Sequence, residues 1–298
     1  EIRLSLVGSE MCIRDRWYLL VAEGGTGPGH MVTIARSPSI RGPFEPAPTN
    51  PILTHRSTSA AVQSTGHSDL IELADGSWAL VFLATRPRGT FPRWHTNGRE
   101  TFLAGVDWVD DWPVVDEARY DVPVSTSSFV DEFRGEVLHP RWIAPGTAPS
   151  TFARTSADGL RLDPGRDALT ASAERLLAVR AEDELWSARL HATGDVALSV
   201  RMDDAHQLLV ERIGEEVRAR IVIGPLSDVV ASATVSADAA LEIRAVEFEA
   251  ERGARRGPDL LRAGVAAAEG FVELAALDGR YLLSLIHISE PTRLRRIS

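Results

Sequence analysis

The chain has 298 residues, of which 44% are hydrophobic and 25% charged, and its formal net charge is −10 at pH 7. This composition is typical of a globular protein of one or two domains. The acidic balance argues against a nucleic-acid or membrane partner, and no apolar run has the length of a membrane-spanning helix.

The two ends of the chain differ in character from the rest. Residues 1–15, with the letters LVGSEMCIRD, and residues 283–298, with LSLIHISEPTR, resemble translations of one sequencing adapter in opposite orientations. We expect both to be artefacts, to be left out of fold reasoning; the alternatives are an N-terminal strand and a basic tail. Cys12, the only cysteine, lies in the first stretch and indicates no redox compartment. We expect the true N-terminus to be missing. The localisation is therefore unknown, with the cytoplasm weakly favoured.

Residues 16–116 form short β-rich runs separated by glycine and proline. The runs are, in chain order, 17–22, 31–36, 69–73, 78–85, 100–108 and 112–115. The letters ADGS between the third and fourth runs are a hairpin turn signal. Four-stranded units of about 40–50 residues are typical of propeller blades, so this segment predicts about two blades. The tryptophans at 78, 108 and 112 are expected in the blade cores.

Residues 117–129 are predicted to be a linker, because the sequence pattern beyond them changes to many short alternating runs. The runs expected as strands there are 159–163, 175–181, 185–192, 195–202, 207–213, 217–223, 228–236, 241–249 and 271–277. The alanine-rich stretch 263–268 is strand or loop, since Gly264 and its β-branched neighbours disfavour a helix. Many short alternating strands predict a two-sheet sandwich over residues 130–282.

One acidic side chain stands at the end of an apolar run. Glu23 ends the run 17–22 and precedes a glycine-rich loop, where the backbone turns sharply and a ligand can approach closely. A carboxyl in such a pocket can act as a general acid if burial raises its pKa. The alternative is a solvated loop glutamate, which the local pattern alone favours.

Three basic residues lie next to the ends of other β-rich runs. His30 enters the second run, and is either a packed histidine or a site residue. His67 precedes the third run, with the same two readings. Arg99 precedes the run 100–108; it either binds sugar hydroxyls or a carboxylate, or is a surface arginine paired with Glu100.

Three stretches in order resemble glycoside hydrolase family 43, in particular its β-xylosidase-like members. They read YLLVAEGGTGPGHMVTIARS with GPFEPAPTNPILTHR, then VQSTGHSDLIELADGSWALVFLATRP, then GRETFLAGVDWVDDWPVV. The letters DEF at 131–133 with LHPRW at 138–142, and DGRYL at 278–282, resemble segments of the sandwich that follows the propeller in that family. The resemblance implies an all-β fold: the last two blades of a five-bladed β-propeller (16–116), then a concanavalin A-like β-sandwich (130–282).

The resemblance also implies roles for the candidate residues. Glu23 corresponds to the general acid, His67 and Arg99 to residues near the sugar, and His30 to a substrate-binding position of less defined role. The family inverts configuration and needs an aspartate base, with a second aspartate that tunes the acid. The resemblance places both in blades that would precede residue 17.

The implied function is that of an exo-glycosidase. We expect a fragment of an inverting enzyme that releases terminal xylose or arabinose from xylan-derived oligosaccharides, inactive by itself because the base lies in the earlier blades and Asp69 and Asp75 sit on the wrong blade to replace it. The alternative is a glycan-binding sandwich without catalysis, although only Trp142 and Trp186 lie in that half. We expect no metal and no cofactor, an oligosaccharide substrate, no nucleic-acid or membrane partner, and a homo-oligomer as one option for the complete enzyme.

Overall fold

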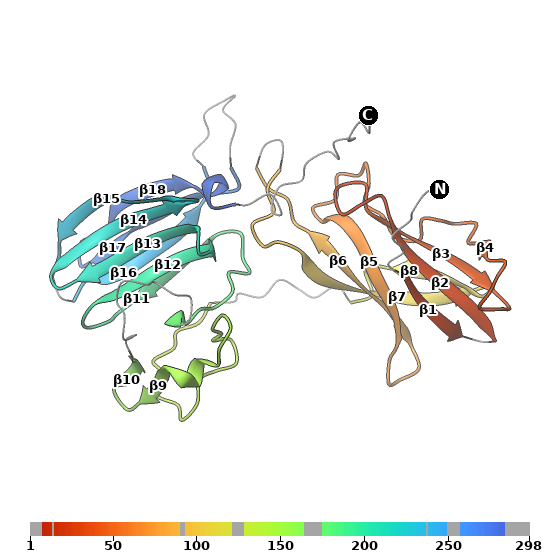
Figure 1. Ribbon diagram of the computed structural model, residues 1–298, viewed down its shortest axis with the longest axis horizontal. Coiled ribbons are helices and arrows are strands. Elements are labelled where there is room, and N and C mark those ends of the chain that lie inside the picture. The colour runs from red at the N-terminus through yellow and green to blue at the C-terminus, as the bar shows by residue number, and fades with distance from the viewer. Residues whose placement is uncertain are drawn as a thin grey trace. The chain divides into compact units, whose positions relative to one another are not determined.

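The computed structural model describes residues 8–13, 15–89, 93–120, 128–163, 175–236, 238–248 and 257–283. Apart from two short 3-10 helices, η1 (Pro149–Thr151) and η3 (Gly279–Leu282), the regular elements in these ranges are strands (Figure 1), which confirms the all-β prediction. The chain divides into two compact units. The first holds Glu1–Pro123, Glu247–Leu261 and Leu277–Ser298, and the second holds Val124–Val246 and Arg262–Ala276.

The first unit begins with a four-stranded antiparallel sheet. Its strands follow one another in space as in the chain: β1 (Gly8–Ile13), β2 (Arg16–Glu23), β3 (Met31–Ser37) and β4 (Glu45–Pro46). Strand β1 lies within the stretch that was expected to be an artefact and pairs with β2 along its whole length. The alternative reading, a strand over residues 2–7, lies outside the described residues, and the adapter origin of the stretch stays a prediction.

A second four-stranded sheet of the same order follows in the first unit. It consists of β5 (Gln63–Glu72), β6 (Trp78–Thr85), β7 (Glu100–Val109) and β8 (Trp112–Asp116). Strand β5 packs against β2 and β3, so the two sheets share one hydrophobic core. Each sheet is a four-stranded antiparallel meander, the arrangement from which propeller blades are built; their assignment to a propeller stays a prediction.

Six aromatic residues of the first unit lie in or against that shared core: Tyr18, Trp78, Phe82, Phe102, Trp108 and Trp112. Tyr18 is 1% exposed, and its ring meets Trp108 edge-on with 5.2 Å between centroids. Trp78 packs edge-on against the other side of Trp108 at 5.5 Å. Arg36 stacks 4.0 Å above Trp112. Edge-to-face pairs add stability beyond burial, so these rings hold the blades together, as expected, and are not exposed sugar platforms.

The second unit is built mainly from two four-stranded antiparallel sheets. One has the order β12 (Val196–Asp203), β13 (His206–Ile213), β14 (Glu216–Ile223) and β15 (Leu226–Thr234). The other has the order β11 (Trp186–Leu190), β16 (Ala240–Val246), β17 (Leu260–Ala267) and β18 (Gly270–Asp278), and the last two strands extend into segments grouped with the first unit. Strand β16 packs against β12 and β13 of the facing sheet.

Some predicted strands of this half differ from the structure. The run 175–181 forms no strand; only Ala178 makes an isolated bridge, with Ile143. A small two-stranded sheet, β9 (Ala153–Ser156) with β10 (Gly159–Leu162), contains one strand that the pattern did not predict. Strand β17 covers most of the alanine-rich stretch and settles it as strand.

The segment with the letters DEF…LHPRW folds on itself. The Trp142 indole donates a hydrogen bond to Asp131 Oδ2 at 2.7 Å, and the Phe133 amide donates to Asp131 Oδ1 at 2.8 Å. The Trp142 bond is the main reason why the pKa of Asp131 lies below its usual value. Phe133 and Phe129 pack against the same indole, with centroids 5.0 and 6.2 Å away. Trp142 is therefore committed to a structural cluster.

Parts of the sequence-based division fall outside the described ranges. They are residues 1–7 and 14 of the stretch 1–15, residues 90–92 of the segment 16–116, residues 121–127 of the predicted linker, residues 164–174, 237 and 249–256 of the predicted sandwich, and all but the first residue of the stretch 283–298. The boundaries 16–116 and 130–282 stay predictions. Within the described ranges, no helix has the length and apolarity needed to span a membrane.

Candidate functional site

The first candidate residue closes a tight hairpin. Glu23 is the last residue of β2 and pairs with Met31, the first residue of β3. The loop between them turns at Gly24 and Gly25, whose φ angles of +76° and +70° favour glycine. A Cβ at Gly24 would lie 1.9 Å from the Gly29 carbonyl oxygen, so the loop has no room for a side chain there. This geometry leaves the Glu23 side chain exposed at the end of the strand.

His30 is the buried member of the set. It is 2% exposed, and its Nδ1 donates to the Ser64 carbonyl oxygen at 3.1 Å, because a carbonyl can only accept. Burial lowers the pKa of His30; the hydrogen bond to Ser64 opposes this shift, and the neighbouring His67 and Arg99 add to it. The ring is therefore neutral near pH 7. A residue this buried reaches a ligand only through its neighbours.

Strand β5 is irregular where it meets His30. Its register with β6 shifts between Gln63 and Gly66 and again between Gly66 and Asp69. Ser64 and His67 adopt φ angles of +58° and +51°, which cost energy for residues with a side chain. Bulges re-aim side chains at the edge of a sheet, and here they leave His67 exposed while Gly66 is buried against the His30 ring.

Arg99 is the last residue of the loop between β6 and β7. It lies between Gly98, with φ +70°, and the first residue of β7. Glu100 binds Arg86 through two hydrogen bonds of 2.8 and 2.7 Å, so the alternative pairing of Arg99 with Glu100 is not formed. Arg99 is exposed and makes no hydrogen bond or ion pair within the described part of the chain.

Strand register brings these positions to one end of the two sheets. Gln63 at the start of β5 pairs with Thr85 at the end of β6, and Ala84 pairs with Glu100 at the start of β7. Arg99 therefore lies at the end of the second sheet where β5 begins. His30 is hydrogen-bonded to Ser64, near the start of β5. It therefore joins that end of the second sheet to the β2–β3 hairpin, which contains Glu23.

His67 and Arg99 lie near enough to the buried His30 imidazole to lower its pKa. Glu23 ends the strand β2, whose hairpin leads through His30 into β3. Glu23, His67 and Arg99 are all exposed. Sequence reasoning missed Ser64 and Gly66, which hold that imidazole. The only local sign of them is the run of small residues before His67.

This arrangement has a defined chemical capacity. A carboxyl beside a guanidinium and an imidazole can protonate a leaving group while the two cationic or polar groups bind hydroxyls. Asp69 and Asp75 lie in the second sheet, whereas Glu23 lies in the first. Asp75 accepts hydrogen bonds of 2.6 and 2.9 Å from Ser77, which lower the pKa of Asp75. Within the described ranges, no three His, Cys, Asp or Glu side chains are placed to hold a metal ion.

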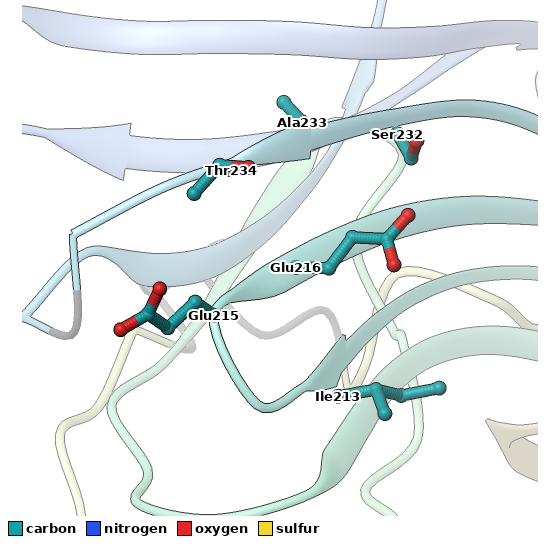
Figure 2. A pocket seen from close by; sticks show the side chains of 6 residues that line it. All are labelled: Ile213, Glu215, Glu216, Ser232, Ala233 and Thr234. Carbon is teal, nitrogen blue, oxygen red and sulfur yellow. The ribbon is translucent and has the colours of Figure 1, made fainter.

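A shallow cavity of about 560 Å³ lies on the second unit, far along the chain from these residues. It is lined by Ile213, Glu215, Glu216, Ser232, Ala233 and Thr234 (Figure 2). The two glutamates point in different directions in Figure 2, and Glu216 is paired with Arg218 at 2.6 Å. No aromatic ring lines this cavity, so it lacks the surface on which proteins usually stack sugars.

Comparison with known sequences relates the first unit to one enzyme family. Residues 10–113 match the sequence model described as glycosyl hydrolases family 43. The chain is 47% identical over 105 residues to the non-reducing end alpha-L-arabinofuranosidase BoGH43B of Bacteroides ovatus. It is 39% identical over 115 residues to a beta-xylosidase of Bacillus subtilis. Each match covers 35% of this chain but only 20% and 21% of the relative, so the matched stretch spans about a fifth of those proteins.

Comparison with solved structures extends over nearly the whole chain. The Bacteroides ovatus protein described as Xyloglucan PUL GH43B superposes with a TM-score of 0.71 and 27% identity, over 92% of this chain and 58% of that one. The GH43 BlXynB protein from Bacillus licheniformis superposes with a TM-score of 0.70 and 22% identity, over 94% of this chain and 59% of that one. These likenesses confirm the predicted all-β fold class.

Proposed function

We propose that the chain is part of an inverting exo-glycosidase that removes terminal xylose or arabinose from xylan-derived oligosaccharides, because residues 10–113 match the sequence model of glycosyl hydrolases family 43. The observation that supports this proposal is that exposed His67 and Arg99 lie near the buried His30, which follows the hairpin loop that begins after the exposed Glu23. The names of the relatives support the substrate class, since they include an arabinofuranosidase, a beta-xylosidase and a xylosidase/arabinosidase of Butyrivibrio fibrisolvens.

The proposed roles follow from the chemistry of each side chain. Glu23 is the general acid that protonates the departing glycosidic oxygen. Arg99 donates hydrogen bonds from a fixed planar group to sugar hydroxyls, and His67 offers a further donor or acceptor from the bulge of β5. His30, which is buried, acts on the sugar only through the position of that bulge.

The chain by itself is proposed to bind the sugar without hydrolysing it. Inversion needs a second carboxylate that activates water on the opposite face of the sugar ring, about 6.5–9.5 Å from the acid. We propose that this second carboxylate comes from another part of the complete enzyme and is neither Asp69 nor Asp75, which is held by Ser77. A single carboxyl can donate a proton but cannot also supply that water.

Sugar binding is the test that uses the chain as it is. Titration of isotope-labelled chain with xylobiose or an arabinofuranosyl oligosaccharide should shift backbone NMR signals near Glu23, His67 and Arg99. Arg99→Ala should weaken binding by at least about tenfold, the loss expected for a hydrogen bond to a charged group. The matched control is Arg41→Ala, which removes another exposed arginine of the first unit and should leave the affinity unchanged.

Two results would contradict the proposal. Shifts confined to residues 213–234 would place glycan binding on the second unit instead, the binding-module alternative. Steady hydrolysis of an aryl xyloside or arabinofuranoside by purified chain would show that the second carboxylate is already present.

A further inference from the structure

The loop between β6 and β7 is held by contacts at several points along its length. At its base Arg86 and Glu100 form the two-bond ion pair described above. Further out, Arg88 and Trp94 exchange backbone hydrogen bonds of 2.7 and 2.9 Å. The Gly98 amide then donates to the His95 carbonyl oxygen at 2.9 Å and leads the chain into Arg99. Loop 86–99, of which the structure describes 86–89 and 93–99, therefore determines where Arg99 stands.

One side chain from a distant part of the sequence reaches into this loop. Asp259, in the segment 247–261 of the same compact unit, places Oδ2 3.7 Å from Arg88 Nη2, with the two side chains 6% and 12% exposed. The same Arg88 nitrogen donates to the Thr96 hydroxyl. Arg88 thus connects the buried carboxylate to both arms of the loop.

The Asp259 side chain is closely packed and buried. A Cβ on Gly279 would lie 1.9 Å from Asp259 Oδ1, so glycine is needed there, and the Gly279 amide donates to the Asp259 carbonyl oxygen at 3.0 Å. Asp259 Oδ1 is buried without a hydrogen-bond partner within the described residues. A buried carboxylate in this condition is costly unless a cation lies beside it, and Arg88 is that cation.

We infer that Asp259 is a positioning residue, whose contact with Arg88 fixes loop 86–99 and thereby the place of Arg99. We name the Arg88–Asp259 contact the clamp. The clamp stands on its own geometry, whereas its value for sugar binding rests on the role proposed above for Arg99.

The carboxyl of Asp259, one partner of the clamp, changes its protonation state in a pH range that experiments can reach. Burial raises the pKa of Asp259 to about 6; Arg88 opposes that rise, and the Asp278 carboxylate adds to it. Asp278 is itself paired with Arg280 at 2.7 Å. Since the folded pKa lies above the usual value, the stability that Asp259 contributes is complete below about pH 4 and is lost as the pH rises through about 6. Replacing Asp259 with a neutral residue should therefore not weaken the fold as a whole at pH 8.

A double-mutant cycle tests the clamp in the full chain. Backbone hydrogen exchange is measured for the Arg88, Trp94 and Gly98 amides in wild type, Asp259→Asn, Arg88→Gln and the double variant. At pH 8 each single change should lower the protection of these amides about tenfold, and the double variant should lose no more than either single one, because both remove the same contact. At pH 5, where Asp259 is protonated, this non-additivity should shrink.

The controls separate the clamp from a general effect on the fold. The Val32 amide, which donates to Leu53 in the first sheet, should keep its protection in all variants. Asp107→Asn breaks another Asp–Arg pair of the same unit, with Arg119, and should leave the loop amides unchanged. Additive losses at pH 8, or loop amides that do not respond to Asp259→Asn, would overturn the inference. Because no sugar is added, either result is independent of whether the proposed glycosidase function holds.

Discussion

Glu23→Ala should slow the hydrolysis of xylo-oligosaccharides roughly 10²–10⁴-fold, the usual contribution of a general acid, in the complete enzyme in which this segment is joined to a base. An alkoxide or sugar leaving group departs only when it is protonated. A nitrophenolate departs without that help, so aryl glycosides should lose far less. The measurement is kcat/KM for a series of substrates that differ only in the pKa of the leaving group.

Two further variants make this result specific. Glu23→Gln keeps the shape of the side chain without an acidic proton, so it should behave like Glu23→Ala. Glu72→Ala removes another exposed strand-end glutamate of the same unit and should change neither substrate class. Equal losses for good and poor leaving groups would rule out an acid role and leave Glu23 with a binding role at most.

Period-two patterning predicted most of the strands because most of them have one buried face. Strand β6 was predicted with its observed bounds, and β2, β3, β7 and β8 to within one residue at each end. The prediction for β5 began at Asp69, whereas the strand begins at Gln63. Two register shifts break the alternation between these positions, so a bulged strand loses the pattern by which strands are recognised.

The candidate residues could be named from the sequence, but their surroundings could not. Glu23 and His30 share one hairpin, so their proximity follows from local pairing. The bond from His30 to Ser64 and the contact of Arg88 with Asp259 join positions far apart in the chain. Neither hydrophobic pattern nor turn chemistry carries information on such pairs. The Arg86–Glu100 pair was missed for the same reason, and the adjacent Arg99 was the only partner that the sequence offered.

Gly66→Ala should lower the free energy of unfolding of the first unit by about 3 kcal/mol, at the upper end of the usual cost of overpacking. The added Cβ would lie 2.3–2.5 Å from three atoms of the His30 ring. That ring is 2% exposed and hydrogen-bonded to Ser64, so it cannot rotate away from the added methyl group. The change should also move the bulge that carries His67. Chemical denaturation followed by tryptophan fluorescence measures the loss.

The neighbouring imidazole provides the decisive comparison. If the clash is with that ring, His30→Ala should restore stability when it is combined with Gly66→Ala, because the truncated side chain makes room for the new methyl group. Gly135→Ala, in the second unit, is the control for a glycine-to-alanine change in general: its Cβ would lie 3.4 Å from the Val137 carbonyl oxygen without a clash, and the unfolding of the first unit should not change. A double variant no more stable than Gly66→Ala alone would mean that the glycine is needed for the backbone of β5 itself. His30 would then not be the residue that fixes the position of His67.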